Sequence, residues 1–208
     1  MRSNKPAPLL IHDWTVFAHP LFLAQLEAIV QQVEGLKERD PVGYVKKNAN
    51  KRLAAIAKLA FDVIPQDPTR PEYRQGNALG DDYKHWFRAK FFQQYRLFFR
   101  YHAPSKVIVL AWVNDEDTKR AYESGDDAYR VFRKMLASGH PPDDWDQLLK
   151  EAKPAAGRLQ STLDAEIFRQ FCELLDAPVK DNTGLARLIT LTPPWSKAAD
   201  IESAGETK

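Results

Sequence analysis

The spacing of apolar side chains predicts two helices near the N-terminus. Residues 20–37 and 41–61 both carry apolar side chains at steps of three and four, which is typical of amphipathic helices. Asp40-Pro41 is typical of a helix start, with a capping aspartate and a proline in the first turn. Because the connection is short, we expect the two helices to form an antiparallel hairpin. The apolar stripe of the first helix consists of Phe22, Leu26, Ile29, Val33 and Leu36.

After residue 71 the apolar period changes to two, as in β-strands. We expect an edge strand at 72–79 and further strands at 85–92, 95–102 and 107–113. The last three are joined by short links, so we expect them to pair as antiparallel neighbours. The run VIVLAWV at 107–113 is apolar on both faces, which indicates a strand covered on both sides.

Helices are also predicted after the sheet. Residues 126–137 keep the helical spacing, and a short helix from Asp143 has an acidic first turn that suits the helix dipole. Residues 154–157 have the composition of a linker. Residues 162–176 carry a clean apolar stripe, and Ser161 is a suitable cap for that helix.

These elements predict an α+β fold, in which two N-terminal helices pack on a small, mostly antiparallel twisted sheet and further helices follow. The chain has 208 residues, which suits one domain of roughly 150 residues with an appendage. We place the domain at 1–153 and a C-terminal extension, one amphipathic helix with a polar tail, at 154–208.

Composition excludes several classes of protein. No apolar run approaches the ~20 residues that span a bilayer, and the first residues lack the pattern of a secretory signal. Cys172 is the only cysteine, which excludes a disulfide framework and a cysteine-rich zinc site. A reducing, cytoplasmic location is the simplest expectation.

Positive charge is concentrated in one segment. The whole chain has 30 Lys and Arg against 28 Asp and Glu, a net charge of only +2. Residues 83–102, however, hold five cations, two histidines, nine aromatic residues and no acidic residue. This segment therefore carries a charge that the totals conceal.

Strand alternation gathers these cations on one face of the predicted sheet. Arg88 and Lys90 share a face of one strand, and Arg96, Arg100 and His102 share a face of its neighbour. If the two faces coincide, about four cations lie close together, and like charges at such pairs are destabilising. A bound phosphate would complete the site. Alternatively, the cations are solvated or pair with acids elsewhere in the chain.

Other side chains give weaker indications of a functional site. His140, Asp143 and Asp144 could ligate a metal, but a helix start explains both aspartates, so we expect no metal or other cofactor. His85 falls on the predicted core face. Most aromatic residues of 83–102 are expected in the core, and those on the basic face, which could stack on bases, are Trp86, Phe92 and Phe98.

Several strings resemble those of a known family, the YhaV toxins of bacterial toxin–antitoxin modules. They include YRLFFRY at 95–101, WVNDE at 112–116 and GHPPDDW at 139–145. The resemblance covers about residues 12–150. It implies a RelE-like fold and a metal-independent endoribonuclease, an mRNA interferase that inhibits translation and growth. It also implies translated mRNA on the ribosome as substrate and a PrlF-type, AbrB-like antitoxin as partner.

The resemblance also implies site residues. In the RelE group the 2′-hydroxyl attacks the adjacent phosphate, and cations stabilise the charge that develops in the transition state. Lys90 could assist proton transfer, and Tyr122 could stack on a base or activate the 2′-hydroxyl. The residues that we expect to act in catalysis are Arg88, Lys90, Arg96, Arg100 and Tyr122. Those that we expect to bind substrate are Arg74, Lys84, His102 and Arg120.

Alternatives remain open. The same basic face would serve a non-catalytic inhibitor that binds RNA or the ribosome, because binding needs only charge and stacking. Repression of its own operon is a further alternative, although no helix-turn-helix pattern is visible. The helix of the extension could pack on the toxin, form a dimer contact, bind the antitoxin or cover the basic face in cis.

Overall fold

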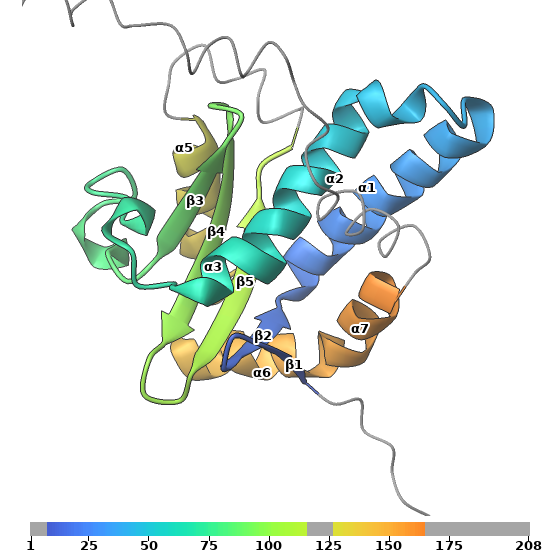
Figure 1. Cartoon of the computed structure of the whole chain (residues 1–208). Coiled ribbons are helices and arrows are strands. Elements are labelled where there is room, and N and C mark those ends of the chain that lie inside the picture. Colours follow the sequence, from blue (N-terminus) through green and yellow to red (C-terminus); the bar gives the residue numbers. More distant parts are fainter. Residues whose placement is uncertain (1–7, 116–126, 165–208) are drawn as a thin grey trace, which may run out of the picture. The chain divides into compact units, whose positions relative to one another are not determined.

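The computed structural model describes residues 8–115 and 127–164, which form helices on both sides of a sheet (Figure 1). The strands are β1 (Leu9–Ile11), β2 (Trp14–Ala18), β3 (Phe87–Phe91), β4 (Tyr95–His102) and β5 (Val107–Val113). The α-helices are α1 (Pro20–Arg39), α2 (Asn48–Lys58), α3 (Ile64–Gln66), α5 (Asp127–Ala137), α6 (Trp145–Ala152) and α7 (Ala156–Asp164). Shorter helical turns are η1 (Tyr44–Lys46), η2 (Leu59–Val63), η3 (Pro71–Tyr73), η4 (Asp81–Tyr83) and η6 (Lys153–Ala155).

The sheet has five strands in the order β1-β2-β5-β4-β3, so β1 and β3 are its edges. Its pairs are antiparallel except that β2 runs parallel to β5, which makes the sheet mixed. The register between β4 and β5 shifts at Phe98 and Phe99, where β5 has one extra residue, Ala111. The predicted α+β class and the antiparallel pairing of β3, β4 and β5 are confirmed.

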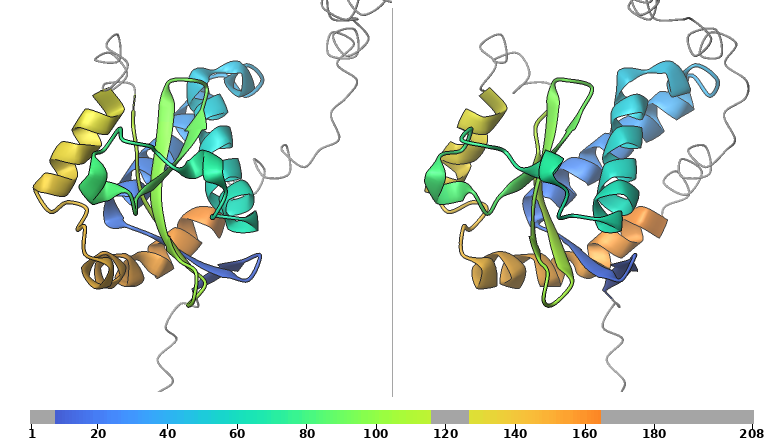
Figure 2. Two further views of the ribbon diagram at one scale, coloured as in Figure 1. Left: turned by 90° about the vertical axis from the view of Figure 1, so that its left-hand side faces the viewer. Right: turned by 60° about the vertical axis from the view of Figure 1, so that its left-hand side comes forward.

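Each face of the sheet is covered by its own apolar cluster. Figure 2 shows the sheet with α5 on one side and with α1 and α2 on the other. Leu97 and Phe99 of β4 point into the cluster formed with α1 and α2. Phe98 points to the opposite face, where it packs with Phe132 of α5. Residues 108–113 of β5 are buried throughout, as a strand covered on both sides requires.

The N-terminal hairpin was not predicted. Strands β1 and β2 are joined at His12 and Asp13, whose φ angles are 46° and 66°. Both residues therefore take the left-handed conformation of a tight hairpin turn, although neither is glycine. Strand β2 then lies beside β5, with Thr15 opposite Val107. This pairing places the start of α1 directly against the centre of the sheet.

Two predicted boundaries are wrong. The expected edge strand at 72–79 is absent: η3 and turns occupy the segment, and only Arg74 forms an isolated bridge with Phe87 of β3. The second helix begins at Asn48 and not at residue 41, because Asp40 ends α1 and its side chain accepts a hydrogen bond from the backbone of Gly43.

The predicted linker at 154–157 is also wrong. These residues belong to η6 and α7, and Ala155 and Leu159 are part of the cluster on the α1 side. Arg158 of α7 pairs with Glu27 of α1. The start of the extension therefore packs on the same chain, whereas the rest of the helix expected to continue to residue 176, with Cys172, lies outside the described residues.

Within residues 8–115 and 127–164, no helix combines the length and the apolar character needed to cross a membrane.

Candidate functional site

The predicted basic face exists, and α5 and α6 flank it. The register between β3 and β4 places Lys90 opposite Arg96 and Arg88 opposite Phe98. Arg100 follows two residues further along β4, about 7 Å from Phe98, and so lies on the same face. The alternation in the sequence therefore predicted the shared face correctly. Phe98 and the rings above it separate Arg100 from the other cations.

Arg88 and Arg96 meet around Tyr129 of α5. The Nε atom of Arg88 donates to the Tyr129 hydroxyl at 2.8 Å, and another guanidinium nitrogen donates to the Glu72 carbonyl at 2.6 Å. Arg96 is 6% exposed, and its guanidinium lies 6.0 Å from the centre of the Tyr129 ring. It donates to the carbonyls of Gln93 and Tyr95, so part of its hydrogen-bonding capacity holds the β3–β4 turn.

Arg100 is half-buried between two indole rings. Its guanidinium carbon lies 5.5 Å from the ring centre of Trp86 and 5.4 Å from that of Trp145. It donates to the backbone carbonyl of Asp143. Burial lowers the pKa of Arg100 below its ordinary value, while the charges of Asp143 and Asp144 act in the opposite direction. A guanidinium keeps its proton under these conditions, so Arg100 is a partly desolvated positive charge.

A histidine and a carboxylate lie beside Arg100. The Nε2 atom of His85 is 2.7 Å from Oδ1 of Asp143, and the indole nitrogen of Trp86 donates to the same oxygen at 2.7 Å. The prediction that His85 faces the core is wrong, because its side chain is 40% exposed. The ring of His102 lies 5.8 Å from that of Trp145, and its Nδ1 is 2.7 Å from the Ser105 hydroxyl.

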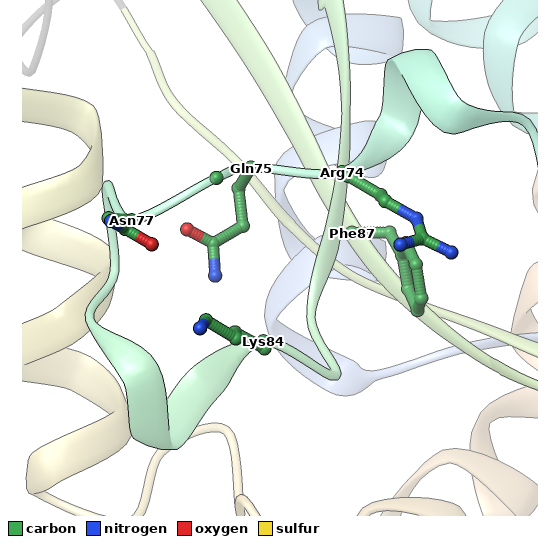
Figure 3. Close-up of a pocket in the computed structure, with 6 residues that line it drawn as sticks. Arg74, Gln75, Asn77, Lys84 and Phe87 are labelled. Atoms are coloured by element: carbon green, nitrogen blue, oxygen red, sulfur yellow. The ribbon is translucent and has the colours of Figure 1, made fainter.

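Two cavities open along the edge strand β3. One, of about 460 Å³, is lined by Arg74, Gln75, Gly76, Asn77, Lys84 and Phe87, and so brings together two of the four predicted substrate-binding residues, Arg74 and Lys84 (Figure 3). In that view Gln75 and Lys84 point toward each other, whereas Arg74 extends beside Phe87. Lys84 also pairs with Asp81 at 2.7 Å. The second cavity, of about 330 Å³, includes Arg88, Lys90 and the buried Tyr73 in its lining.

The aromatic residues of the basic face divide into two kinds. Trp86 and Phe98 are fully buried beneath α5, so their rings cannot stack on a base. Phe92, at the β3–β4 turn, is 54% exposed and can. The predicted site residues Arg120 and Tyr122 lie outside the described residues.

Sequence reasoning missed Tyr129 and Asp143. Tyr129 sits in the apolar stripe of α5, where helical spacing indicates a core residue and nothing distinguishes its hydroxyl. Asp143 precedes a helix whose cap is Asp144, and the acidic first turn explained both carboxylates. Within the described part of the chain, no three His, Cys, Asp or Glu side chains are grouped as metal ligands.

Comparisons with known proteins identify the family. The profile of a family described as "Toxin with endonuclease activity, of toxin-antitoxin system" matches residues 16–153. "Ribonuclease toxin YhaV" of Escherichia coli K12 is 45% identical over 148 residues, which are 70% of this chain and 96% of that protein. "Toxin YhaV" of Escherichia coli O157:H7 matches with the same identity and coverage. No solved structure gives a significant match. The chain therefore belongs to the YhaV family, the endonuclease toxins of toxin–antitoxin systems.

Proposed function

We propose that this endonuclease cleaves RNA, and that the basic face of β3 and β4 binds the RNA backbone, with Arg100 at the scissile phosphate. The name of the Escherichia coli K12 relative, a ribonuclease toxin, supports RNA as substrate. The geometry supports RNA binding at this face, because Arg88, Lys90 and Arg100 project from one side of two paired strands.

The chemistry needs only a positioned phosphate and stabilisation of charge. The 2′-hydroxyl attacks the adjacent phosphorus, and negative charge grows on the non-bridging oxygens in the transition state. Guanidinium groups bind such oxygens in a bidentate manner and stabilise them most strongly where water is partly excluded. The proposed reaction uses no metal, and Arg96 supports Arg88 through their shared contact with Tyr129.

One observation carries the proposal: the half-buried charge of Arg100 pairs with no carboxylate in the part of the chain that the structure describes. Its one acceptor among the described residues is a carbonyl, and no described carboxylate forms an ion pair with it. Arg88 likewise donates only to a hydroxyl and a carbonyl within residues 8–115 and 127–164. A partly desolvated cation is stabilised by an anion, and phosphate has the geometry that a guanidinium prefers.

The test is cleavage of labelled RNA by the purified protein, alone and with translating ribosomes. We expect Arg100→Ala and Arg88→Ala each to slow cleavage about 100-fold or more, the usual loss when a preorganised donor is removed. Arg39→Ala, at the exposed last turn of α1, is the matched control and should cleave normally. RNA that binds to the wild-type protein without being cleaved would support a non-catalytic inhibitor instead.

The finer biological setting belongs to the same proposal. We place the substrate as translated mRNA on the ribosome in the cytoplasm, and the partner as a PrlF-type antitoxin that masks the basic face. We also assign a RelE-like arrangement to the domain at 1–153, since α1 and α2 pack together on one face of the sheet. Growth arrest on induction, relieved by the antitoxin, tests this setting.

Arg74, Lys84 and His102 extend the proposed RNA surface on either side of the phosphate. The cavity with Arg74 and Lys84 can accept a neighbouring nucleotide, because it combines two cations with amide groups and the half-buried ring of Phe87. Arg120 and Tyr122 keep their predicted roles. Arg74→Ala is expected to weaken RNA binding more than it slows the bound reaction.

A further inference from the structure

Three histidines of the described residues lie near carboxylates, and only one of them is built to move a proton. His12 and Asp62 are 3.8 Å apart on the surface, a loose pair. His19 is 3% exposed, and both of its ring nitrogens are used, one by Glu151 and one as the cap of α1. His85 alone combines a short contact to a carboxylate with a side chain that is 40% exposed.

The surroundings of His85 fix its tautomer. Asp143 accepts from the Trp86 indole nitrogen and lies 2.7 Å from Nε2 of His85. A carboxylate at this position requires Nε2 to carry a proton, so in the neutral ring Nδ1 is the free acceptor. No described residue bonds to Nδ1. The arrangement is that of a general base whose orientation is set by a second residue.

Asp143 also links this histidine to the phosphate-binding cation. Its carboxylate contacts His85, and its backbone carbonyl accepts from Arg100. One residue therefore holds a base and a guanidinium side by side at the flank of the basic face. Of the charged groups at this flank, Asp143 contacts His85, and the charges of Asp143 and Asp144 act on Arg100 of β4. Cleavage of RNA through its 2′-hydroxyl uses this combination, a proton acceptor next to hydrogen-bond donors that bind the phosphate.

We propose that His85 is the general base of the endonuclease and that Asp143 is its positioning residue. This inference rests on the proposed ribonuclease function and deepens it. Nδ1 of His85 takes the proton of the 2′-hydroxyl as the 2′-oxygen bonds to phosphorus. The bond from phosphorus to the 5′-oxygen breaks, and the leaving 5′-oxygen takes a proton from water. The products are a 2′,3′-cyclic phosphate and a 5′-hydroxyl, and the imidazolium returns its proton to solvent.

The first test is His85→Gln in full-length protein, assayed with ribosomes and with free RNA. The glutamine amide can still donate to Asp143 but cannot accept the proton, so we expect cleavage to fall by about 10²- to 10⁴-fold. RNA affinity and the midpoint of urea unfolding should stay close to those of the wild type. His12→Gln, which alters the loose surface pair at the far edge strand, is the matched control and should cleave normally.

Chemical rescue separates a base from a structural side chain. Adding imidazole to His85→Ala should restore cleavage at least several-fold, and the restored rate should follow the concentration of neutral imidazole. Asp143→Asn should lower the cleavage rate, because it removes the charge that orients the ring of His85. In that background, replacing His85 should lower the rate by a smaller factor than it does in the wild type. A structural role would give unfolding defects and no rescue.

The outcomes distinguish the two proposals. Wild-type protein that produces no cleavage in either assay overturns the ribonuclease function and the base together. Wild-type cleavage combined with an unchanged rate in His85→Gln overturns the base alone. Products that end in a 3′-phosphate with no cyclic intermediate would also contradict it.

Discussion

Replacing Phe98 by alanine tests whether the apolar cluster under α5 supports the basic face. The Phe98 side chain is completely buried on the strand that carries Arg96 and Arg100. Its ring stacks on Phe132 of α5, with centres 4.1 Å apart and planes 17° apart. It also packs on Trp112 at 5.8 Å. The change therefore opens a cavity between β4 and α5.

Loss of a buried phenylalanine ring destabilises a protein by about 3–5 kcal/mol, because transfer free energy is lost and the site collapses only in part. Specific ring pairs add ~0.5–1.5 kcal/mol each. Phe98 has ring partners on several sides, including Tyr129 at 5.6 Å, so we expect the upper part of the range. Phe98→Leu keeps an apolar group in the site and should cost roughly 1.5 kcal/mol.

Urea unfolding followed by tryptophan fluorescence measures both variants, with the slope against urea compared to confirm one cooperative transition. A loss below about 1.5 kcal/mol for Phe98→Ala would refute the packing argument. The same variants address base stacking. Since Phe98 is covered, Phe98→Leu should bind RNA as the wild type does, and a large loss of RNA affinity without loss of stability would show that RNA reaches the ring.

Further changes test other parts of the fold. Burial lowers the pKa of His19 below 6.5 and outweighs the opposite effect of Glu151, while His140 lowers it further. The unfolded chain therefore binds the proton more readily, so the free energy of unfolding should fall as the pH drops below about 6.5, and urea titrations of His19→Gln should show a weaker decline. Gly80 has φ of +94°, so Gly80→Ala should cost about 1–3 kcal/mol in urea unfolding. Gly35 lies in α1 with open space around it, so Gly35→Ala should raise the thermal midpoint, a gain of about 1 kcal/mol.

The sequence predicted those elements whose pattern of apolar and polar residues lies within the element itself. The period of two located β3, β4 and β5, and it also placed Arg88 and Arg100 on one face. The hairpin of β1 and β2 was not predicted because its turn, His12-Asp13, has no glycine, which two-residue hairpin turns usually contain. Strand β2 also pairs with β5, whose residues lie far away in the sequence, and no local pattern reports such a pairing.

The candidate site shows the same division. Its cations could be predicted because strand alternation fixes their direction. The groups that contact them could not, because Tyr129 and Asp143 reach the sheet through the packing of α5 and of the segment before α6. His85 was placed on the wrong face because β3 begins at Phe87, and the alternation does not extend to the residues before it.

Helices cover both faces of the sheet, so RNA can approach the basic face only from its edge or its flanks. Strand β3 is an open edge, and a lysine such as Lys90 on an edge strand has another explanation, since edge charges prevent association with other sheets. Arg100 has no such explanation, because β4 lies between β3 and β5. Its charge is half-buried between indole rings without a carboxylate pair among the described residues. If RNA binds here, Arg100→Ala should slow cleavage about 100-fold or more while leaving the fold intact, and Lys90→Ala should slow it less. If Lys90 alone mattered, RNA would lie along the edge of the sheet and the His85 flank would not take part.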